Sequence, residues 1–275
     1  MERLQIGTRR RLAGGLGGEH RSPLHGESVD YADHRRYHQG DDYRRIDYNL
    51  YARLDVLMIK LFEAEDDLTL RLLVDTSASM GVAGKLHQAR RVAAALGFVG
   101  LLRRDPVIVH TFAGETQPRR FVGRSATWDL FDHLSGLRAA GPTAFAAAAT
   151  DLLARPGPAG LTVVISDLLT PDWAENLTRL STRRGDVVVV HVLSSEDLRP
   201  TLFGDLDLVD VETGRSLAVS LTADVLAGYE REARRWVDEV AARCHRAGVV
   251  VLPIMADDDL ERVLLARWRA SGALR

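Results

Sequence analysis

The sequence predicts an α/β fold with a mostly parallel central sheet, helices on both faces and a polar arm at the N-terminus. Strand-like apolar runs alternate with helix-like segments from residue 70 onward, and this alternation is typical of a parallel sheet that is covered on both faces. The run at residues 70–74 is largely apolar and ends in Asp75, as a buried parallel strand does at the carboxyl edge of such a sheet. Residues 1–54 are instead rich in Arg, His, Asp, Tyr and Gly, with few aliphatic residues.

The elements of the main domain, residues 55–275, follow in order. A strand at residues 56–62 is joined to the strand at 70–74 by a short acidic connection. If these two strands pair, they must be antiparallel, because a parallel crossover needs about a dozen residues or more. The remaining pattern predicts helices at 85–103, 127–137, 143–154, 173–180, 223–247 and 258–270, strands at 106–112, 161–165, 186–193 and 249–254, and a hairpin around residues 212–214.

The helix expected at residues 223–247 has the clearest pattern. Its apolar residues recur at spacings of three and four, which indicates a stripe that faces the core, and Gly248 follows as a C-terminal cap. Cys244 lies on this stripe and is the only cysteine of the chain. We therefore expect a buried small hydrophobe rather than a nucleophile, and no internal disulfide can form.

Composition excludes several classes of function. The chain has 275 residues, 46% of them hydrophobic, and a net charge of -2, so it can bury a full core and is not built mainly to neutralise phosphates or an anionic membrane. The longest apolar run, residues 92–102, falls far short of the roughly 20 residues that span a bilayer. With one cysteine and no signal-peptide pattern at residues 1–11, we expect a cytoplasmic protein without a membrane span.

The candidate site begins where the strand at 70–74 ends. Asp75, Ser77 and Ser79 offer one carboxylate and two hydroxyls at alternate positions, and Gly81 then allows a tight backbone turn. Oxygen ligands of this kind suit a hard cation such as Mg²⁺, with Mn²⁺ or Ca²⁺ as alternatives, and a magnesium site keeps positions open for other ligands. The pattern predicts an incomplete metal site at the carboxyl edge of the sheet, where open α/β folds bind their ligands.

Two later loops can add ligands. Thr143 follows a Gly-Pro pair, and Asp167 follows the apolar strand at 161–165. Each residue has a structural alternative, because Thr, Ser and Asp also cap helices: Thr143 could cap the helix after it, and Ser166 or Asp167 could cap the next one. Five oxygen-bearing residues at the ends of three segments favour a shared site, and a cap can also be a ligand.

These five residues resemble a known site. Asp-x-Ser-x-Ser, then Thr in a Gly-Pro-Thr turn, then Asp after an apolar strand is similar to the metal-ion-dependent adhesion site of von Willebrand factor A (vWA) domains. The resemblance implies a Rossmann-like vWA domain with Asp75, Ser77, Ser79, Thr143 and Asp167 as the metal ligands. It also implies that an Asp or Glu of a partner protein fills the open metal position.

The arm and the strand after it carry a second resemblance. Residues 28–63 contain Arg-x-Tyr at 35–37, Gly-Asp at 40–41, Arg-x-Ile-Asp followed by Tyr48, Ala-Arg at 52–53, and Glu63. This series resembles the signature of the bacterial and archaeal domain-of-unknown-function family 58, although that family usually has Trp where Tyr48 stands. Genes of the family commonly adjoin those of MoxR-type AAA+ ATPases. The resemblance therefore implies an adaptor for such an ATPase, or for its client, in the assembly or maturation of other proteins.

Other functions of the arm are less well supported. His34 and His38 have helical spacing, but no Glu adjoins His34 and no cysteine joins them, so solvated histidines fit better than a zinc site. The arginines could contact nucleic acid, yet aspartates interleave with them. Internal ion pairs are therefore favoured, and we expect the arm, residues 1–54, to pack on the main domain.

An enzymatic function is the main alternative. A strand-end Asp75 could act as the nucleophile of a metal-dependent hydrolase or phosphatase. The phosphatases that resemble haloacid dehalogenases need a second Asp two residues later, where this chain has Ser77. Neither a Gly-x-Ser-x-Gly motif nor a phosphate-binding P-loop is present. We therefore expect a non-enzymatic protein-interaction module.

Overall fold

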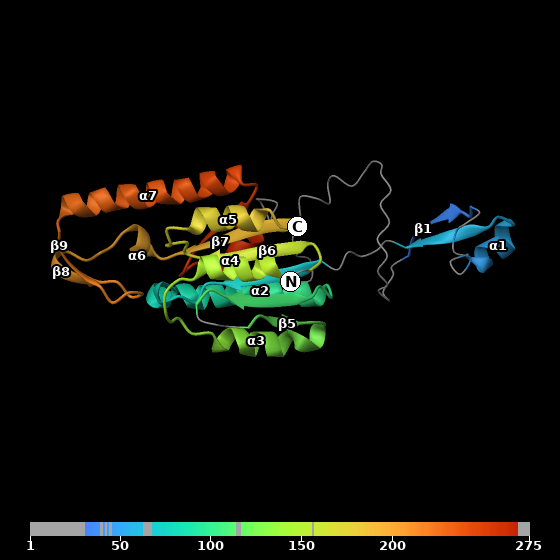
Figure 1. The fold of residues 1–275 in the computed structure, drawn as a ribbon, viewed down its shortest axis with the longest axis horizontal. Coiled ribbons are helices and arrows are strands. Elements are labelled where there is room, and N and C mark those ends of the chain that lie inside the picture. The colour runs from blue at the N-terminus through green and yellow to red at the C-terminus, as the bar shows by residue number, and fades with distance from the viewer. Residues whose placement is uncertain are drawn as a thin grey trace. The chain divides into compact units, whose positions relative to one another are not determined.

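The computed structural model describes residues 31–38, 41, 43, 46–62, 68–113, 117–155 and 157–268. The chain divides into two compact units, Gly15–Asp66 and a larger unit that contains Asp67–Arg275 (Figure 1). No helix in the described ranges is both long and apolar enough to cross a membrane.

The smaller unit contains a two-stranded antiparallel sheet and one helix. Strand β1 (Tyr31–Arg36) pairs with β2 (Met58–Phe62), and α1 (Tyr48–Leu54) lies between them in sequence. The Asp47 carboxylate caps α1 by accepting the backbone N–H groups of Asn49 and Leu50 at 3.0 Å each. The unit ends at Asp66, later than the expected boundary at residue 54, so β2 belongs to it.

The sequence leaves open whether the strand at 56–62 pairs with the strand at 70–74, and the two strands do not pair. The partner of β2 is β1, and β3 (Thr69–Val74) lies between two parallel neighbours that occupy both of its edges. A short connection excludes a parallel pairing of the strands that it joins, but it does not require them to pair. Packing of the arm on the main domain stays a prediction.

Some of the arm's expected contacts fall outside the described residues. This applies to His20, His25 and Glu63, and to the side chains of His34, Arg35, Arg44 and Arg45. His38 is described, and its ring Nδ1 lies 3.1 Å from the backbone oxygen of Arg36.

The larger unit is built on a six-stranded sheet with the order β10-β7-β6-β3-β4-β5. Five strands are parallel, and β5 pairs antiparallel with β4 at one edge. Besides β3, the strands are β4 (Val107–Thr111), β5 (Arg119–Phe121), β6 (Gly160–Ser166), β7 (Gly185–Leu193) and β10 (Val250–Met255). The predicted α/β class with a mostly parallel central sheet is confirmed.

Helices cover both faces of this sheet (Figure 1). On one face lie α2 (Lys85–Leu102), α3 (Thr127–Gly136), and α8 (Leu260–Arg262) with the π-helix η5 (Val263–Trp268). On the other lie α4 (Phe145–Ala154), α5 (Trp173–Ser181) and α7 (Ala223–Arg246). Successive side chains of a strand point to opposite faces, so Leu72 of β3 joins the first core and Leu73 joins the second. Cys244 is buried in the second core, as its stripe predicts.

Three further elements lie near the carboxyl ends of the parallel strands. The chain after β3 forms a 3₁₀ segment, η3 (Ala78–Gly84), and the chain after β7 forms the short α6 (Ser195–Leu198). The predicted hairpin consists of β8 (Gly204–Val209) and β9 (Ser216–Leu221). The helix expected at 258–270 begins instead at Leu260, because the Asp259 carboxylate caps it by accepting two backbone N–H groups.

Strand order creates a topological switch point between β3 and β6. These strands are neighbours, yet α2 leaves β3 on one face of the sheet and α5 follows β6 on the other. Loops diverge at such a switch point, and ligands of open α/β sheets bind there. Asp75 and Asp167 directly follow these two strands.

Candidate functional site

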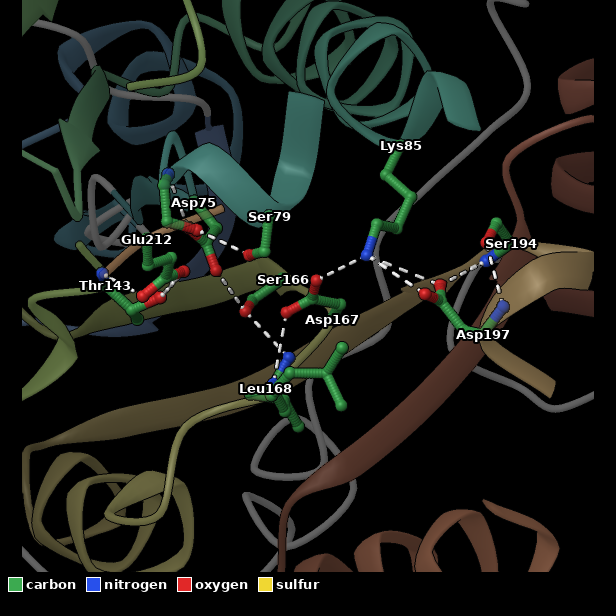
Figure 2. Close-up of polar contacts among 12 residues, drawn as sticks. Asp75, Ser79, Lys85, Thr143, Ser166, Asp167, Leu168, Ser194, Asp197 and Glu212 are labelled. Atoms are coloured by element: carbon green, nitrogen blue, oxygen red, sulfur yellow. Dashed lines mark hydrogen bonds and ion pairs between the residues drawn. The ribbon is translucent and has the colours of Figure 1, made fainter. Parts of the chain in front are cut away.

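The carboxylate of Asp75 lies at the centre of the candidate site. Pairing of Val74 with Ile165 sets the ends of β3 and β6 side by side, and the Asp75 backbone N–H donates to the Ile165 oxygen at 2.9 Å. Ser166, the last residue of β6, donates from its hydroxyl to Asp75 Oδ2 at 2.5 Å (Figure 2). The sheet register therefore fixes one oxygen of this carboxylate.

The loop after β3 fixes the other oxygen. Asp75 Oδ1 accepts the backbone N–H of Ser77 at 2.9 Å and the Ser77 hydroxyl at 2.6 Å. The hydroxyls of Ser77 and Ser79 lie 3.0 Å apart. The alternate spacing of the three residues thus produces one connected row of oxygens.

Burial has a strong effect on Asp75, whose side chain is fully buried. Desolvation raises the pKa of this carboxyl, and the nearby Asp167 adds to the increase. Hydrogen bonds from Ser166 and Ser77 oppose the increase, because they stabilise the charged form. A buried carboxylate in this position favours a cation beside it.

Thr143 lies in a loop that is tied to the loop after β3. The Ala78 backbone N–H donates to the Gly141 oxygen at 2.9 Å, and the Ala140 N–H donates to the Thr76 oxygen at 2.9 Å. Helix α4 begins only at Phe145, and its first turn has no side-chain cap. The reading of Thr143 as a helix cap is therefore wrong, and its hydroxyl is used elsewhere.

A carboxylate from a hairpin that is distant in the sequence accepts two hydrogen bonds from Thr143. Glu212, in the turn between β8 and β9, accepts the Thr143 hydroxyl at 2.7 Å on one oxygen and the Thr143 backbone N–H at 2.9 Å on the other (Figure 2). The Glu212 backbone is held in turn, because its N–H donates to Asp210 Oδ1 at 2.9 Å. The sequence gives no sign of this contact beyond an acidic residue in a predicted hairpin.

Asp167 has a different environment from Asp75. Its Oδ2 accepts the Lys85 ammonium at 2.7 Å (Figure 2), and its Oδ1 accepts the Leu169 backbone N–H at 3.1 Å. Helix α5 has Asp172 at its N-cap position, so neither Ser166 nor Asp167 caps it. Sequence reasoning missed Lys85, because a lysine at the start of a helix is usually solvated.

Lys85 is buried between two acidic residues. Its ammonium also lies 3.4 Å from Asp197, and only 2% of its side chain is exposed. Burial lowers the pKa of Lys85, but Asp167 and Asp197 outweigh that effect, so that the pKa is raised overall. Lys85 therefore stays charged and neutralises Asp167.

The oxygen atoms of this site suit a hard cation, although the protein supplies little negative charge to balance it. A serine hydroxyl that donates its proton to a carboxylate keeps its lone pairs for a cation, as Ser77 can beside Asp75. Because Lys85 satisfies Asp167, the residues that could hold the ion directly are Asp75, Ser77, Ser79 and Thr143. Within the described ranges, no three His, Cys, Asp or Glu side chains form a metal-binding group, so hydroxyls and an added carboxylate would have to complete the sphere.

The family of proteins of unknown function DUF58 matches residues 33–239. The chain belongs to this family. An uncharacterized protein of Mycobacterium tuberculosis is 29% identical to this DUF58 protein over 284 residues, which cover 98% of this chain and 89% of the relative. A shorter uncharacterized protein of Mycobacterium avium is 30% identical over 132 residues, covering 46% of this chain and 78% of the relative.

Among solved structures, the conserved hypothetical protein BatB of Bacteroides thetaiotaomicron is similar to this DUF58 protein with a TM-score of 0.43 and 17% identity. The similarity covers 75% of this chain and 98% of BatB. The VWA domain of SpRpn10 gives a TM-score of 0.36 and 11% identity over 73% of this chain and 94% of that domain.

Proposed function

We propose that this protein is a non-enzymatic interaction module that binds an acidic side chain of a partner protein at a divalent metal site. Asp75, Ser77, Ser79 and Thr143 would hold the ion, Mg²⁺ or alternatively Mn²⁺ or Ca²⁺, and Asp167 would support the site through Lys85 and the backbone. When bound, the ion would supply positive charge and an open coordination position at the sheet edge.

The contact between Glu212 and Thr143 is the observation that carries this proposal. One carboxylate here accepts both the hydroxyl and the backbone N–H of the same residue, at 2.7 and 2.9 Å. The edge of the sheet can therefore receive a carboxylate. An acidic side chain of a partner would make the same two hydrogen bonds after Glu212 leaves.

The environment of Asp75 favours binding over catalysis. A nucleophilic carboxylate needs an exposed oxygen that can reach the substrate. Asp75 is fully buried, and both of its oxygens accept hydrogen bonds from neighbouring residues. This arrangement supports a structural or metal-binding role for Asp75 rather than the hydrolase or phosphatase alternative.

The family gives the proposal a partner class. The chain belongs to DUF58, and genes of this family commonly adjoin those of MoxR-type ATPases. This supports the role of an adaptor that presents its sheet edge to such an ATPase or to its client. The near-balanced charge supports a protein partner rather than nucleic acid. A single buried cysteine is compatible with the reducing cytoplasm, where we propose that the protein acts.

A pull-down with a purified MoxR-type ATPase from the same organism tests this function. We expect wild-type protein to retain the ATPase in millimolar Mg²⁺ and to lose it in EDTA, and Asp75→Ala and Asp167→Ala to lose it in both. Both carboxylates are buried, so their removal can also affect folding. Ser79→Ala is the milder variant, because Ser79 is only half-buried. Glu232→Gln, an exposed change on α7, is the matched control. Binding that ignores EDTA and these site variants would remove the metal from the mechanism.

A further inference from the structure

A polar pocket lies at the opposite end of β3 from Asp75. It has a volume of about 550 Å³ and lies on the sheet face that α4 and α5 cover. Its walls include the start of β3, the end of α4, the loop before β6 and the segment after α5. The polar side chains among them are mostly basic: Arg71, His110, Arg120, Arg155 and Arg183.

Arg71 is the most unusual residue of this pocket. Only 2% of this β3 residue is exposed, although arginine is rarely buried without a partner. One guanidinium nitrogen, Nη2, donates to the Pro158 oxygen at 2.7 Å. The other, Nη1, is buried and has no hydrogen-bond partner in the described part of the chain. An unsatisfied buried donor is costly, particularly on a charged group, so a negative charge near this guanidinium would be stabilising.

Arg183 is directed to the same place as Arg71. Its Nη1 donates to the Leu152 and Arg155 backbone oxygens at 2.8 and 3.0 Å, which fixes the guanidinium at the end of α4. A Cβ atom on Gly157 would lie 3.2 Å from an Nη2 of both Arg71 and Arg183. Two guanidinium groups therefore converge on the space that the missing side chain of Gly157 leaves open.

The positive charge of the pocket is only partly neutralised. Arg155 pairs with Asp151 through two hydrogen bonds of 2.9 Å each. Among described residues, no carboxylate forms a salt bridge with Arg71, Arg120 or Arg183. Burial, followed by repulsion from Arg183, lowers the pKa of Arg71 to about 10, which leaves it charged at neutral pH.

We propose that this pocket binds the phosphate group of a small molecule. Guanidinium groups match the geometry of phosphate oxygens and bind them through paired charge-assisted hydrogen bonds. Arg71 and Arg183 would hold the phosphate over Gly157, and Arg120 at the rim would add attraction. The wall also contains the apolar side chains of Pro106, Ile108, Pro118 and Leu152, which suit an organic group attached to the phosphate. The volume is within the usual range of small-molecule sites.

Calorimetry on the full-length protein in EDTA tests this proposal, with inorganic phosphate and phenyl phosphate as the probes. We expect both to bind at low salt, and phenyl phosphate to bind more tightly if the apolar wall contributes. Equal affinity for the two probes would overturn the role of the apolar wall and would limit the site to the phosphate group itself. Titration of His110 gives a second readout, because a bound anion would offset the arginines that lower its pKa and would move that pKa upward.

Variants of the pocket separate specific binding from general attraction. Arg183→Gln should reduce affinity roughly tenfold or more, as expected for loss of a charge-assisted contact. Gly157→Ala should weaken binding without a change in charge, because the new methyl group would occupy the binding space. Arg119→Gln, which removes the same charge from the neighbouring position of β5 outside this pocket, is the matched control and should bind normally.

Arg71→Gln is the direct test of the buried donor, and Gly157→Ala remains informative if that variant does not fold. Absence of binding to wild-type protein at millimolar phosphate would overturn the proposal. An equal loss of affinity in Arg119→Gln and Arg183→Gln would also overturn it, since it would indicate attraction without a defined site. Because the experiment contains EDTA, neither result depends on the metal-dependent function proposed above.

Discussion

At the residue scale, Lys85 acts as a built-in cation of the candidate site. Its ammonium forms ion pairs with Asp167 and Asp197, and the described part of the chain shows none to Asp75. The two acidic residues that follow β3 and β6 therefore have different roles. Asp167 is neutralised by the protein itself, whereas Asp75 depends on hydroxyl groups and on any cation that binds beside it.

Replacement of Lys85 by Met should destabilise the protein strongly. Removing one partner of a buried ion pair typically costs about 3–5 kcal/mol, because the remaining charge is left unpaired. The double variant Lys85→Met with Asp167→Asn should recover part of this loss, since it removes that charge as well. Urea unfolding in EDTA measures both effects, and Arg235→Gln on the exposed face of α7 is the control. A double variant no more stable than the single one would contradict the neutralising role of Lys85.

His110 should make stability depend on pH. Burial, with smaller contributions from Arg155, Arg71 and Arg183, lowers its pKa from 6.5 to about 4 in the folded protein, against a smaller opposing effect of Asp151. Because the unfolded chain binds the proton more readily, this contribution to stability is fully present above pH 6.5 and is lost as the pH falls toward 4.

The size of this effect can be isolated with one substitution. The loss should reach about 3 kcal/mol near pH 4, and His110→Gln should flatten the pH dependence of the unfolding free energy by that amount. His245→Gln, on an exposed part of α7, should leave it unchanged. If the unfolding free energy of wild type and of His110→Gln changes with pH in the same way, His110 does not have the lowered pKa that its burial implies.

Local spacing explains which site residues the sequence could reveal. Asp75, Ser77 and Ser79 are predictable because the strand ends in the oxygens that form the row. The Lys85–Asp167 pair joins residues 82 positions apart, and Glu212 lies 69 positions from Thr143. Contacts of this kind depend on how strands and hairpins are placed in space, which no local pattern encodes.

At the element scale, strands with a clear local sequence pattern were predicted, whereas strands that depend on the surrounding fold were not. Buried strands such as β6 are apolar over their whole length and stand out in the sequence. Strand β5 has only three residues, two of them exposed arginines, so neither periodicity nor composition indicates it. For β2, the short connection to β3 limits the direction of pairing but does not identify the partner, and β1 takes that position.

The β8–β9 hairpin should act as a reversible cover of the candidate site. It is joined to Thr143 by the two hydrogen bonds of Glu212, and many of its other residues are exposed. Glu212→Gln removes the charge and should loosen this contact. We expect faster amide hydrogen exchange in the hairpin, and tighter Mg²⁺-dependent binding of the MoxR-type ATPase, because the partner's carboxylate would no longer compete with Glu212.

The matched control for the hairpin is Asp207→Asn, an exposed change on β8. It removes an equal charge without touching Thr143 and should alter neither exchange nor binding. If Glu212→Gln speeds exchange but weakens ATPase binding, Glu212 contributes to the partner's site instead of competing for it. Unchanged exchange would mean that the Glu212 contact does not hold the hairpin.

At the scale of the whole molecule, the two proposed sites lie at opposite ends of β3 and should act independently. A ligand that binds only the folded state stabilises it by RT ln(1 + [L]/Kd), about 2.7 kcal/mol at a hundredfold excess over Kd. In protein stripped of metal, millimolar Mg²⁺ should therefore raise the Tm, and phenyl phosphate in EDTA should raise it separately. Distant sites without shared contacts usually behave additively.

Paired variants give this independence a sharp test by thermal unfolding. Thr143→Ala should remove the response to Mg²⁺ and keep the response to phenyl phosphate, because its hydroxyl belongs only to the Asp75 end of the sheet. Gly157→Ala should do the reverse, because its added methyl group would meet Arg71 and Arg183. Loss of both responses in either variant would indicate a general loss of folding. A Tm that Mg²⁺ does not move in wild-type protein would count against the metal site alone, since the phosphate pocket shares none of its residues.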